Sequence, residues 1–469
     1  MPITAPLPLQ HPKIHCRKAH GRLDASRSIT VNRLSSPQMP SPKYPRFKIL
    51  DELPDHLLVD VDCYDEEHRV KLSGNGYPSA VQSIAGTTIR IPSADFLAYF
   101  LFRKQRFRPD LYSRLKAVKK SHLYEAAAEL ENLVALRDGT IATEDGVVKA
   151  DSTLTGRIGE AVSLCAINQI HDTGPGDWLA LPESVDEIPR GLRPFDFRIQ
   201  TASDGKKVIQ VEAKGSFARG SVDLKSKAVR KHASDILRKK ETHTVVPEAR
   251  SGIWLADLRY GTITVFGDLT RGTARCWLLD PPAEGNGDPY RLRVVARMLH
   301  ATNLLQLLAP RSQLTIAVVN RVASVLLGED IARFDGRPVL RQNGESFSDV
   351  VEGAAEMGMS RTKFSANRTQ VRGHPIVGAV FKSRRMPFLF VGIREDLLRA
   401  VVDQELDTLS SYTTKPRAFD GFIDAVMPAG SAKEMGFPEV PSGPYFRRHF
   451  RGRLFSSSSG LVFGQVEPV

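Results

Sequence analysis

Cysteine is scarce in this 469-residue chain, and long uncharged hydrophobic runs are missing. The four cysteines lie far apart and form no C-x-x-C pair, which argues against a disulfide framework or a structural zinc site and favours a reducing cytoplasm. They are Cys16, Cys63, Cys165 and Cys276. Because spanning a bilayer takes about 20 consecutive apolar residues, we do not expect an integral membrane protein. The basic, proline-rich N-terminus also lacks the apolar stretch of a secretory signal.

Acidic residues are in the minority. Asp and Glu number 53 against 65 Lys and Arg, so the formal net charge is +12. Such an excess favours a polyanionic partner, nucleic acid before a membrane surface. Hydrophobic residues make up 41% and charged residues 25%, which is typical of folded globular proteins and excludes a wholly disordered or fibrous chain. At about 100–200 residues per domain, the length allows two to four domains.

The first third of the chain divides into two parts. Residues 1–45 combine recurring prolines with many basic residues and one acid, Asp24, and are predicted to form a disordered basic arm. Residues 46–148 are predicted to be an α+β region with a helix at 121–136. Just before that helix, at 102–120, basic residues alternate with aromatic ones. This pattern suits single-stranded nucleic acid, and it equally suits a solvated helix face.

The middle of the chain, residues 149–285, follows the order helix, three strands, helix and two strands. The first helix starts at Leu154, and the second is a basic helix at 225–240. The three strands between them are expected near Trp178, Phe195 and Val208, and the last two strands at 253–258 and 263–266, separated by Gly261. A strand–helix alternation of this kind predicts an α/β domain.

Residues 286–469 are expected to form a mainly helical or mixed domain. Helices are predicted at 292–308 and 314–327, with Pro310 between them. A segment resembling a helix-turn-helix at 347–364 overlaps a basic stretch and is a further candidate for DNA binding. The basic stretch consists of Arg361, Lys363, Arg368, Arg372 and His374.

Two strands of the middle region can be paired from the sequence. Residues 195–199 and 208–214 alternate apolar and polar side chains, and a three-residue loop with Gly205 joins them. Pairing across this loop gives partners whose numbers sum to 408, which matches the apolar faces throughout. The same register places Asp196 opposite Glu212, with Lys214 one step further along that face.

Two carboxylates opposite each other repel, so Asp196 and Glu212 predict a positive charge between them. A hard divalent cation with oxygen ligands fits, and Mg²⁺ commonly takes one or two carboxylates plus substrate phosphate. Lys214 beside the pair could orient or help to deprotonate a water. The other interpretation is a charged strand edge with an ordinary salt bridge.

A third acid belongs to the preceding helix, which is apolar nearly all round and is therefore predicted to be buried. Glu160 lies within it, and a buried glutamate needs a metal, a lysine or the helix dipole to stabilise it. The helix at 225–240 is expected to present cations to phosphates beside this cluster. Its basic residues are Lys225, Lys227, Arg230, Lys231, Arg238, Lys239 and Lys240. His232 on the same helix is interpreted as an interface or surface residue.

Residues 151–280 resemble the PD-(D/E)XK nuclease superfamily, which has the restriction-endonuclease-like fold. Glu212-Ala213-Lys214 matches the (D/E)XK element, and Pro194-Phe195-Asp196 matches its "PD" with one residue inserted. The helix that carries Glu160 resembles the first helix of the family. The resemblance implies an α/β fold with an αβββαβ core and a phosphodiesterase that depends on Mg²⁺ or Mn²⁺.

The resemblance also implies roles for individual residues. The side chains of Asp196 and Glu212 and the carbonyl of Ala213 would bind the metal, Lys214 would act on the attacking water, and Glu160 would assist. The first interpretation is a cytoplasmic deoxyribonuclease in restriction or antiviral defence. RNA as the substrate, a homodimer and partner subunits of a defence complex are left open. The alternative is a non-catalytic nucleic-acid-binding protein that keeps the fold.

Overall fold

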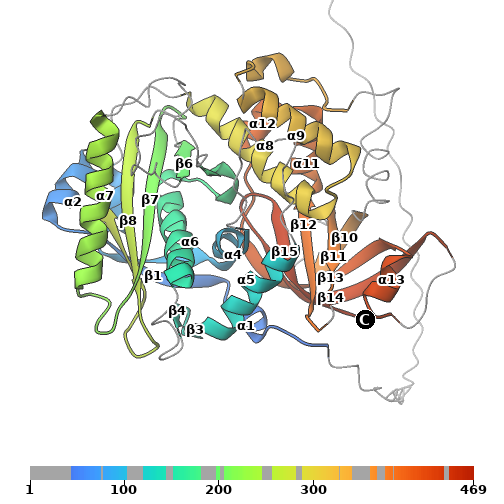
Figure 1. The fold of residues 1–469 in the computed structure, drawn as a ribbon, viewed down its shortest axis with the longest axis horizontal. Coiled ribbons are helices and arrows are strands. Elements are labelled where there is room, and N and C mark those ends of the chain that lie inside the picture. The colour runs from blue at the N-terminus through green and yellow to red at the C-terminus, as the bar shows by residue number, and fades with distance from the viewer. Residues whose placement is uncertain are drawn as a thin grey trace, which may run out of the picture. The chain divides into compact units, whose positions relative to one another are not determined.

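The computed structural model of the chain contains a mixed sheet and a closed barrel of strands within residues 44–469 (Figure 1). It describes residues 44–74, 78–102, 120–143, 152–180, 197–200, 205–245, 256–280, 288–326, 328–340, 360–366, 375–383, 385–437 and 443–469. Residues 1–43 of the predicted basic arm lie outside these ranges, as do 103–119 of the basic and aromatic stretch. In the part that is described, no helix combines the length and apolarity needed to cross a membrane.

A nine-stranded mixed sheet forms the first layer. Its strands follow the order β3-β4-β1-β9-β8-β7-β6-β5, and β2 pairs with β1 outside this path. They are β1 (His56–Cys63), β2 (Thr87–Pro92), β3 (Val134–Arg137), β4 (Thr140–Thr143), β5 (Leu179–Ala180), β6 (Phe197–Gln200), β7 (Val208–Phe217), β8 (Leu258–Phe266) and β9 (Arg275–Leu279). Because β1 pairs in parallel with β9, strands from both sides of residue 148 share this sheet.

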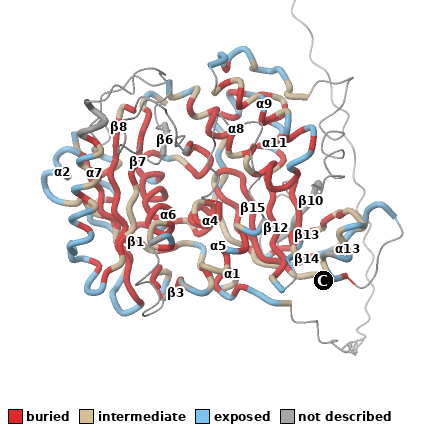
Figure 2. Tube along the Cα trace, in the orientation of Figure 1, coloured by how far each residue is buried: buried red, intermediate tan, exposed pale blue. Residues whose placement is uncertain are grey.

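Helices from the first part of the chain pack around this sheet. They are α1 (Lys48–Glu52), α2 (Glu66–Ser73), α3 (Pro78–Ile84), α4 (Ser93–Phe102) and α5 (Lys120–Leu133). The helix predicted at 121–136 corresponds to α5, which ends earlier because Val134 begins β3. In α4 every residue but Tyr99 is buried, so this helix lies inside the protein (Figure 2).

The middle region confirms the α/β class, and its elements follow the predicted order as far as α7. The strands predicted at 253–258 and 263–266 coincide with only one described strand, β8, and β9 is not predicted. Helix α6 (Ser152–His171) precedes β5, β6 and β7, and α7 (Lys227–Val245) precedes β8 and β9. The predicted hairpin register is also confirmed where it is described, since Phe197 pairs with Val211 and Ile199 with Ile209.

The predicted break at Gly261 is wrong. Residues 258–266 form the single strand β8, and Gly261 lies inside it. A Cβ atom at Gly261 would lie 2.5 Å from Cγ2 of Ile236 in α7. Glycine is therefore needed here for the close approach of a helix to the strand rather than for a turn.

The helices α6 and α7 cover opposite faces of the sheet (Figure 1). At α6 the approach is closest between two glycines. A Cβ atom on Gly215 of β7 would collide with the carbonyl oxygen of Thr155, and one on Gly159 would collide with Cα of Gly215. Since strand side chains alternate, the odd-numbered residues of β7 face α6 and the even-numbered residues face α7.

Two helices follow as predicted, α8 (Pro289–Leu308) and α9 (Gln313–Leu326). The expectation of a mainly helical C-terminal region is nevertheless wrong. Six strands close into a barrel in the order β10-β11-β12-β15-β14-β13. They are β10 (Ser360–Ala366), β11 (Ile376–Phe381), β12 (Phe388–Arg394), β13 (Arg417–Pro428), β14 (Tyr445–Ser456) and β15 (Leu461–Pro468). Short helices accompany them: α11 (Glu395–Asp403), α12 (Leu406–Ser411) and α13 (Ser431–Glu434).

Buried residues recur at every second position in the barrel strand β13, from Phe419 to Met427, which is a strand pattern. The prediction of a mainly helical region missed this pattern. The described end of the segment expected to resemble a helix-turn-helix, residues 360–364, belongs to strand β10, and the rest of that segment lies outside the described residues. The last strand, β15, also contacts the start of the unit, where the Phe47 amide donates to Oε1 of Gln465 at 2.6 Å.

A buried acid connects α4 to the turn between β14 and β15. The Asp95 carboxylate accepts from the Ser458 amide at 2.8 Å and from the Ser458 hydroxyl at 3.0 Å. Burial raises the pKa of Asp95 to about 6, although both hydrogen bonds oppose the shift. The carboxyl group therefore binds a proton more readily in the folded chain than in the unfolded chain.

This junction predicts a pH dependence of stability. As the pH falls from 7 to 4, protonation of Asp95 is expected to add up to about 3 kcal/mol to the free energy of unfolding, and this gain is lost as the pH rises through about 6. Burial lowers the pKa of His300 to about 4, which acts in the opposite direction over the same range. Urea unfolding of wild type and of Asp95→Asn at several pH values isolates the contribution of Asp95, which is the difference between their free energies of unfolding. If the two free energies change with pH in parallel, this prediction is contradicted.

Candidate functional site

The centre of the candidate site is Glu212, which is fully buried in the middle of β7. Its Oε1 lies 2.5 Å from Nζ of Lys214 on the same strand. The same oxygen accepts a hydrogen bond from Nζ of Lys239 on α7. Its second oxygen, Oε2, has no hydrogen-bond partner among the described residues. One carboxylate oxygen is thus shared by two ammonium groups, and the other is buried without a hydrogen-bond partner among the described residues.

In this cluster one carboxylate faces two lysines. The Lys214 and Lys239 side chains are 27% and 22% exposed, so the cluster reaches solvent through its cations. A buried carboxylate is tolerated only when it is paired, and the two lysines provide that pairing.

His232 belongs to the same neighbourhood, although the sequence suggests an interface or surface residue. It lies on α7, half-buried and next to β7. Burial lowers the pKa of His232, the charge of Lys214 lowers it further, and a hydrogen bond with the Gly215 backbone opposes both. The spacing of His232 and Lys239 is a signal that could have placed them together, since residues seven apart lie on one face of a helix.

Contacts are shown for part of the predicted set. Glu212 and Lys214 meet on the face of the sheet that α7 covers, and Ala213 lies between them on β7. Glu160 is buried in α6, which packs against the opposite face. Asp196 lies outside the described residues, so its predicted position opposite Glu212 stays a prediction.

The predicted phosphate-binding cations separate into two groups. Lys225 lies over the rings of Tyr64 and Trp277, Lys239 binds Glu212, and Lys240 is buried against Asp280. Four others are exposed on α7 and suited to phosphate contacts: Lys227, Arg230, Lys231 and Arg238. The sequence pattern does not separate these groups, because a lysine that pairs with a buried acid looks like any other.

The exposed cations of α7 predict a measurable salt effect. Replacing all four by alanine is expected to weaken DNA binding and to reduce the slope of log K against log salt by about 0.9 for each phosphate that is no longer neutralised. Fluorescence anisotropy with labelled duplex DNA over a range of salt concentrations measures both quantities. A matched control replaces four exposed cations elsewhere: Arg311, Arg333, Arg399 and Lys433. Equal slopes for the two variants would show that α7 is not part of the DNA interface.

The fit of a divalent cation depends on oxygen donors. Oε2 of Glu212 is a buried carboxylate oxygen without a hydrogen-bond partner among the described residues, and carboxylate oxygens are the ligands that Mg²⁺ or Mn²⁺ prefers. Within the described ranges, which exclude Asp196, no group of three or more His, Cys, Asp or Glu side chains could hold a metal ion. Glu212 therefore fits as one ligand.

Comparison with protein-family models, with curated proteins and with solved structures gave no match to this chain.

Proposed function

We propose that this protein is a metal-dependent endonuclease that hydrolyses phosphodiester bonds in DNA. The observation that supports this most is the buried Glu212 with Lys214 at 2.5 Å, on a strand whose predicted register is found at all four described pairs. That register is the reason for placing Asp196 opposite Glu212 in this proposal. The element order of the middle region agrees with the αβββαβ core of the PD-(D/E)XK superfamily, to which we assign the domain within this proposal.

In this proposal each residue of the site has a role that follows from its chemistry. Glu212, Asp196 and the Ala213 carbonyl would hold Mg²⁺ or Mn²⁺, which when bound polarises the scissile phosphate and stabilises the leaving oxygen. Lys214 would orient the attacking water and help to remove its proton. Lys239 would hold Glu212 in place and add positive charge near the phosphate. The four exposed cations of α7 would bind the flanking backbone without reading its sequence.

A direct assay tests this function. Purified protein is incubated with supercoiled plasmid, linear duplex, single-stranded DNA and RNA, each with Mg²⁺, with Mn²⁺ or with EDTA. Cleavage of DNA that requires the metal supports the proposal, and cleavage of RNA alone would change the substrate. A lack of metal-dependent cleavage of every substrate would refute the nuclease proposal. If DNA is cleaved, a role in restriction or antiviral defence is tested by phage challenge of cells that express the protein.

A second function is favoured by one specific observation. Both lysines already neutralise Oε1 of Glu212, which is also what a purely structural ion-pair cluster would show. The protein would then bind nucleic acid through α7 without cleaving it. Such a binder would keep its affinity when Glu212 is replaced and lose it when the exposed cations of α7 are removed.

A further inference from the structure

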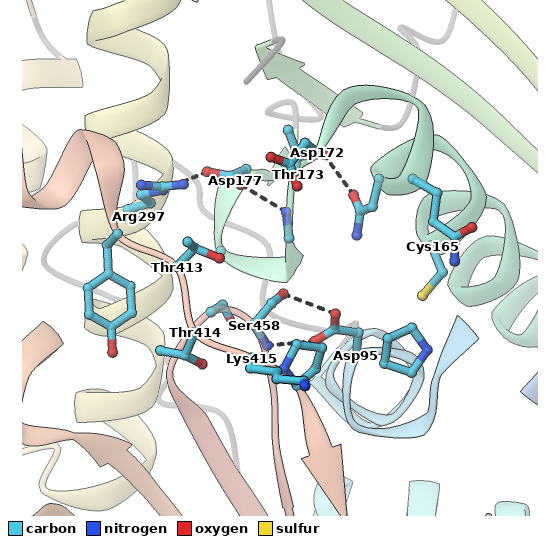
Figure 3. Close-up of a pocket in the computed structure, with 18 of the residues that line it drawn as sticks. Asp95, Cys165, Asp172, Thr173, Asp177, Arg297, Thr413, Thr414, Lys415 and Ser458 are labelled. Carbon is cyan, nitrogen blue, oxygen red and sulfur yellow. Dashed lines mark hydrogen bonds and ion pairs between the residues drawn. The ribbon is translucent and has the colours of Figure 1, made fainter. Parts of the chain in front are cut away.

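A cavity of about 1040 Å³ lies away from Glu212, between the C-terminal end of α6, helix α8 and the turn that joins β14 to β15 (Figure 3). Ligand-binding pockets commonly have about 300–1,000 Å³, so this cavity has room for a molecule of nucleotide size. Its walls are mainly polar and bring charged side chains from several elements to one space. Nothing in the proposed nuclease reaction uses them.

Two arginines of α8 share one buried acid in this cavity. Asp177, at the end of the short 3-10 helix Pro175–Asp177, accepts from Nε of Arg297 at 2.6 Å and from the Gly174 amide at 2.9 Å. Nε of Arg293 lies 3.6 Å from the same carboxylate, which is too long for a hydrogen bond. Since one carboxylate faces two guanidinium groups, this end of the cavity carries a net positive charge.

Arg297 and Arg293 differ in what they are free to bind. Arg297 is fixed, because its Nη1 also donates to the Leu409 carbonyl at 2.6 Å. The Arg293 side chain is only 11% exposed, and its Nε is buried without a hydrogen-bond partner among the described residues. A buried donor without an acceptor is unfavourable, and an oxyanion in the cavity would supply the acceptor.

The rest of the wall is held in place by its own hydrogen bonds. Oδ1 of Asn168 accepts from the Trp178 indole at 2.9 Å and from the Thr173 hydroxyl at 3.0 Å. The Ser459 hydroxyl lies 3.0 Å from Nε2 of His300. Figure 3 shows Thr414 and Lys415 across the space from Asp177 and Arg297, so a third cation lies on the opposite wall. A preorganised polar wall of this kind favours a ligand that carries hydroxyl groups.

Two other acids line the cavity. Asp95 accepts its hydrogen bonds from Ser458, and the negative charge of exposed Asp172 acts on Arg293 without providing the hydrogen-bond acceptor that its Nε lacks. We propose that the cavity binds a small phosphorylated molecule with hydroxyl groups, of the size of a mononucleotide, and that Arg293 holds its phosphate. Arginine suits phosphate because its planar fork can donate two parallel hydrogen bonds. The proposal is independent of nuclease activity.

Calorimetric titration of the full chain tests this site with adenosine 5′-monophosphate, ribose 5-phosphate, inorganic phosphate and adenosine. Saturable binding of at least one phosphorylated probe, and at least tenfold weaker binding of adenosine, is expected. Arg293→Met should weaken the phosphorylated probe at least tenfold, whereas Arg311→Met, at an exposed arginine beyond the end of α8, should not. If Arg293→Met does not fold, Lys415→Ala replaces it and should weaken binding several-fold. The proposal fails if none of the phosphorylated probes binds, or if the folded variants bind as wild type does.

Discussion

Replacing Glu212 by glutamine is expected to reduce metal-dependent cleavage of plasmid DNA by about 100-fold or more. Glutamine has nearly the same shape, so it would fill the same place in β7. It offers no negative charge to a divalent cation, and its amide group would face Lys214 and Lys239 instead of a carboxylate. Initial rates of plasmid nicking at fixed Mg²⁺ concentration measure the effect.

Two further variants separate loss of chemistry from loss of structure. Glu66→Gln removes an exposed acid from helix α2 and should leave cleavage unchanged. Lys214→Met removes the amine next to Glu212 but keeps the Lys239 contact, and it should also abolish cleavage in a folded protein. DNA affinity is expected to persist in all three variants. If Glu212→Gln lowers the melting temperature but cleaves normally, the cluster is a structural ion pair and the catalytic assignment is wrong.

The second large effect is expected at the contact between α6 and β7. Gly215→Ala should lower the free energy of unfolding by about 2 kcal/mol or more, because the added Cβ would collide with the Thr155 carbonyl oxygen. Because the colliding atom belongs to the backbone of α6, no side-chain rotation relieves the collision, and the whole helix has to move. Urea unfolding followed by circular dichroism measures the change.

Gly220→Ala is the matched control for this prediction. Gly220 is exposed, and a Cβ atom there would meet nothing within 4 Å. Its effect is expected to stay within about 0.5 kcal/mol. Gly159→Ala, on the helix side of the same contact, should resemble Gly215→Ala. Equal stability of Gly215→Ala and Gly220→Ala would show that the close packing of α6 on β7 is absent in solution.

The features that the sequence predicts well are the local ones. The hairpin register of β6 and β7 follows from alternating side chains and a short loop, and Phe197 does face Val211. The helices α6 and α7 are likewise visible in their apolar spacing, within a few residues at each end. In each case the partners are close in the chain, so the pattern itself restricts the pairing.

Contacts between distant residues are not predictable in this way. Asp60 of β1 pairs with Arg275 of β9, and Phe364 of β10 pairs with Ile423 of β13. An apolar strand gives no sign of which distant strand it will join. The same limit applies to the candidate site, where the sequence predicts Lys214 beside Glu212 but assigns Lys239 to DNA. Only the packing of α7 on the sheet brings Lys239 to that carboxylate.

The position of β15 has a consequence for biosynthesis. This strand joins β12 to β14 and so closes the barrel, and its Gln465 also binds the amide of Phe47. During translation the ribosome has to release residues 461–468 before any of these contacts can form. Until then β12 and β14 each have an unpaired edge, which is a known route to aggregation. We therefore expect nascent chains that stall before residue 461 to depend on chaperones.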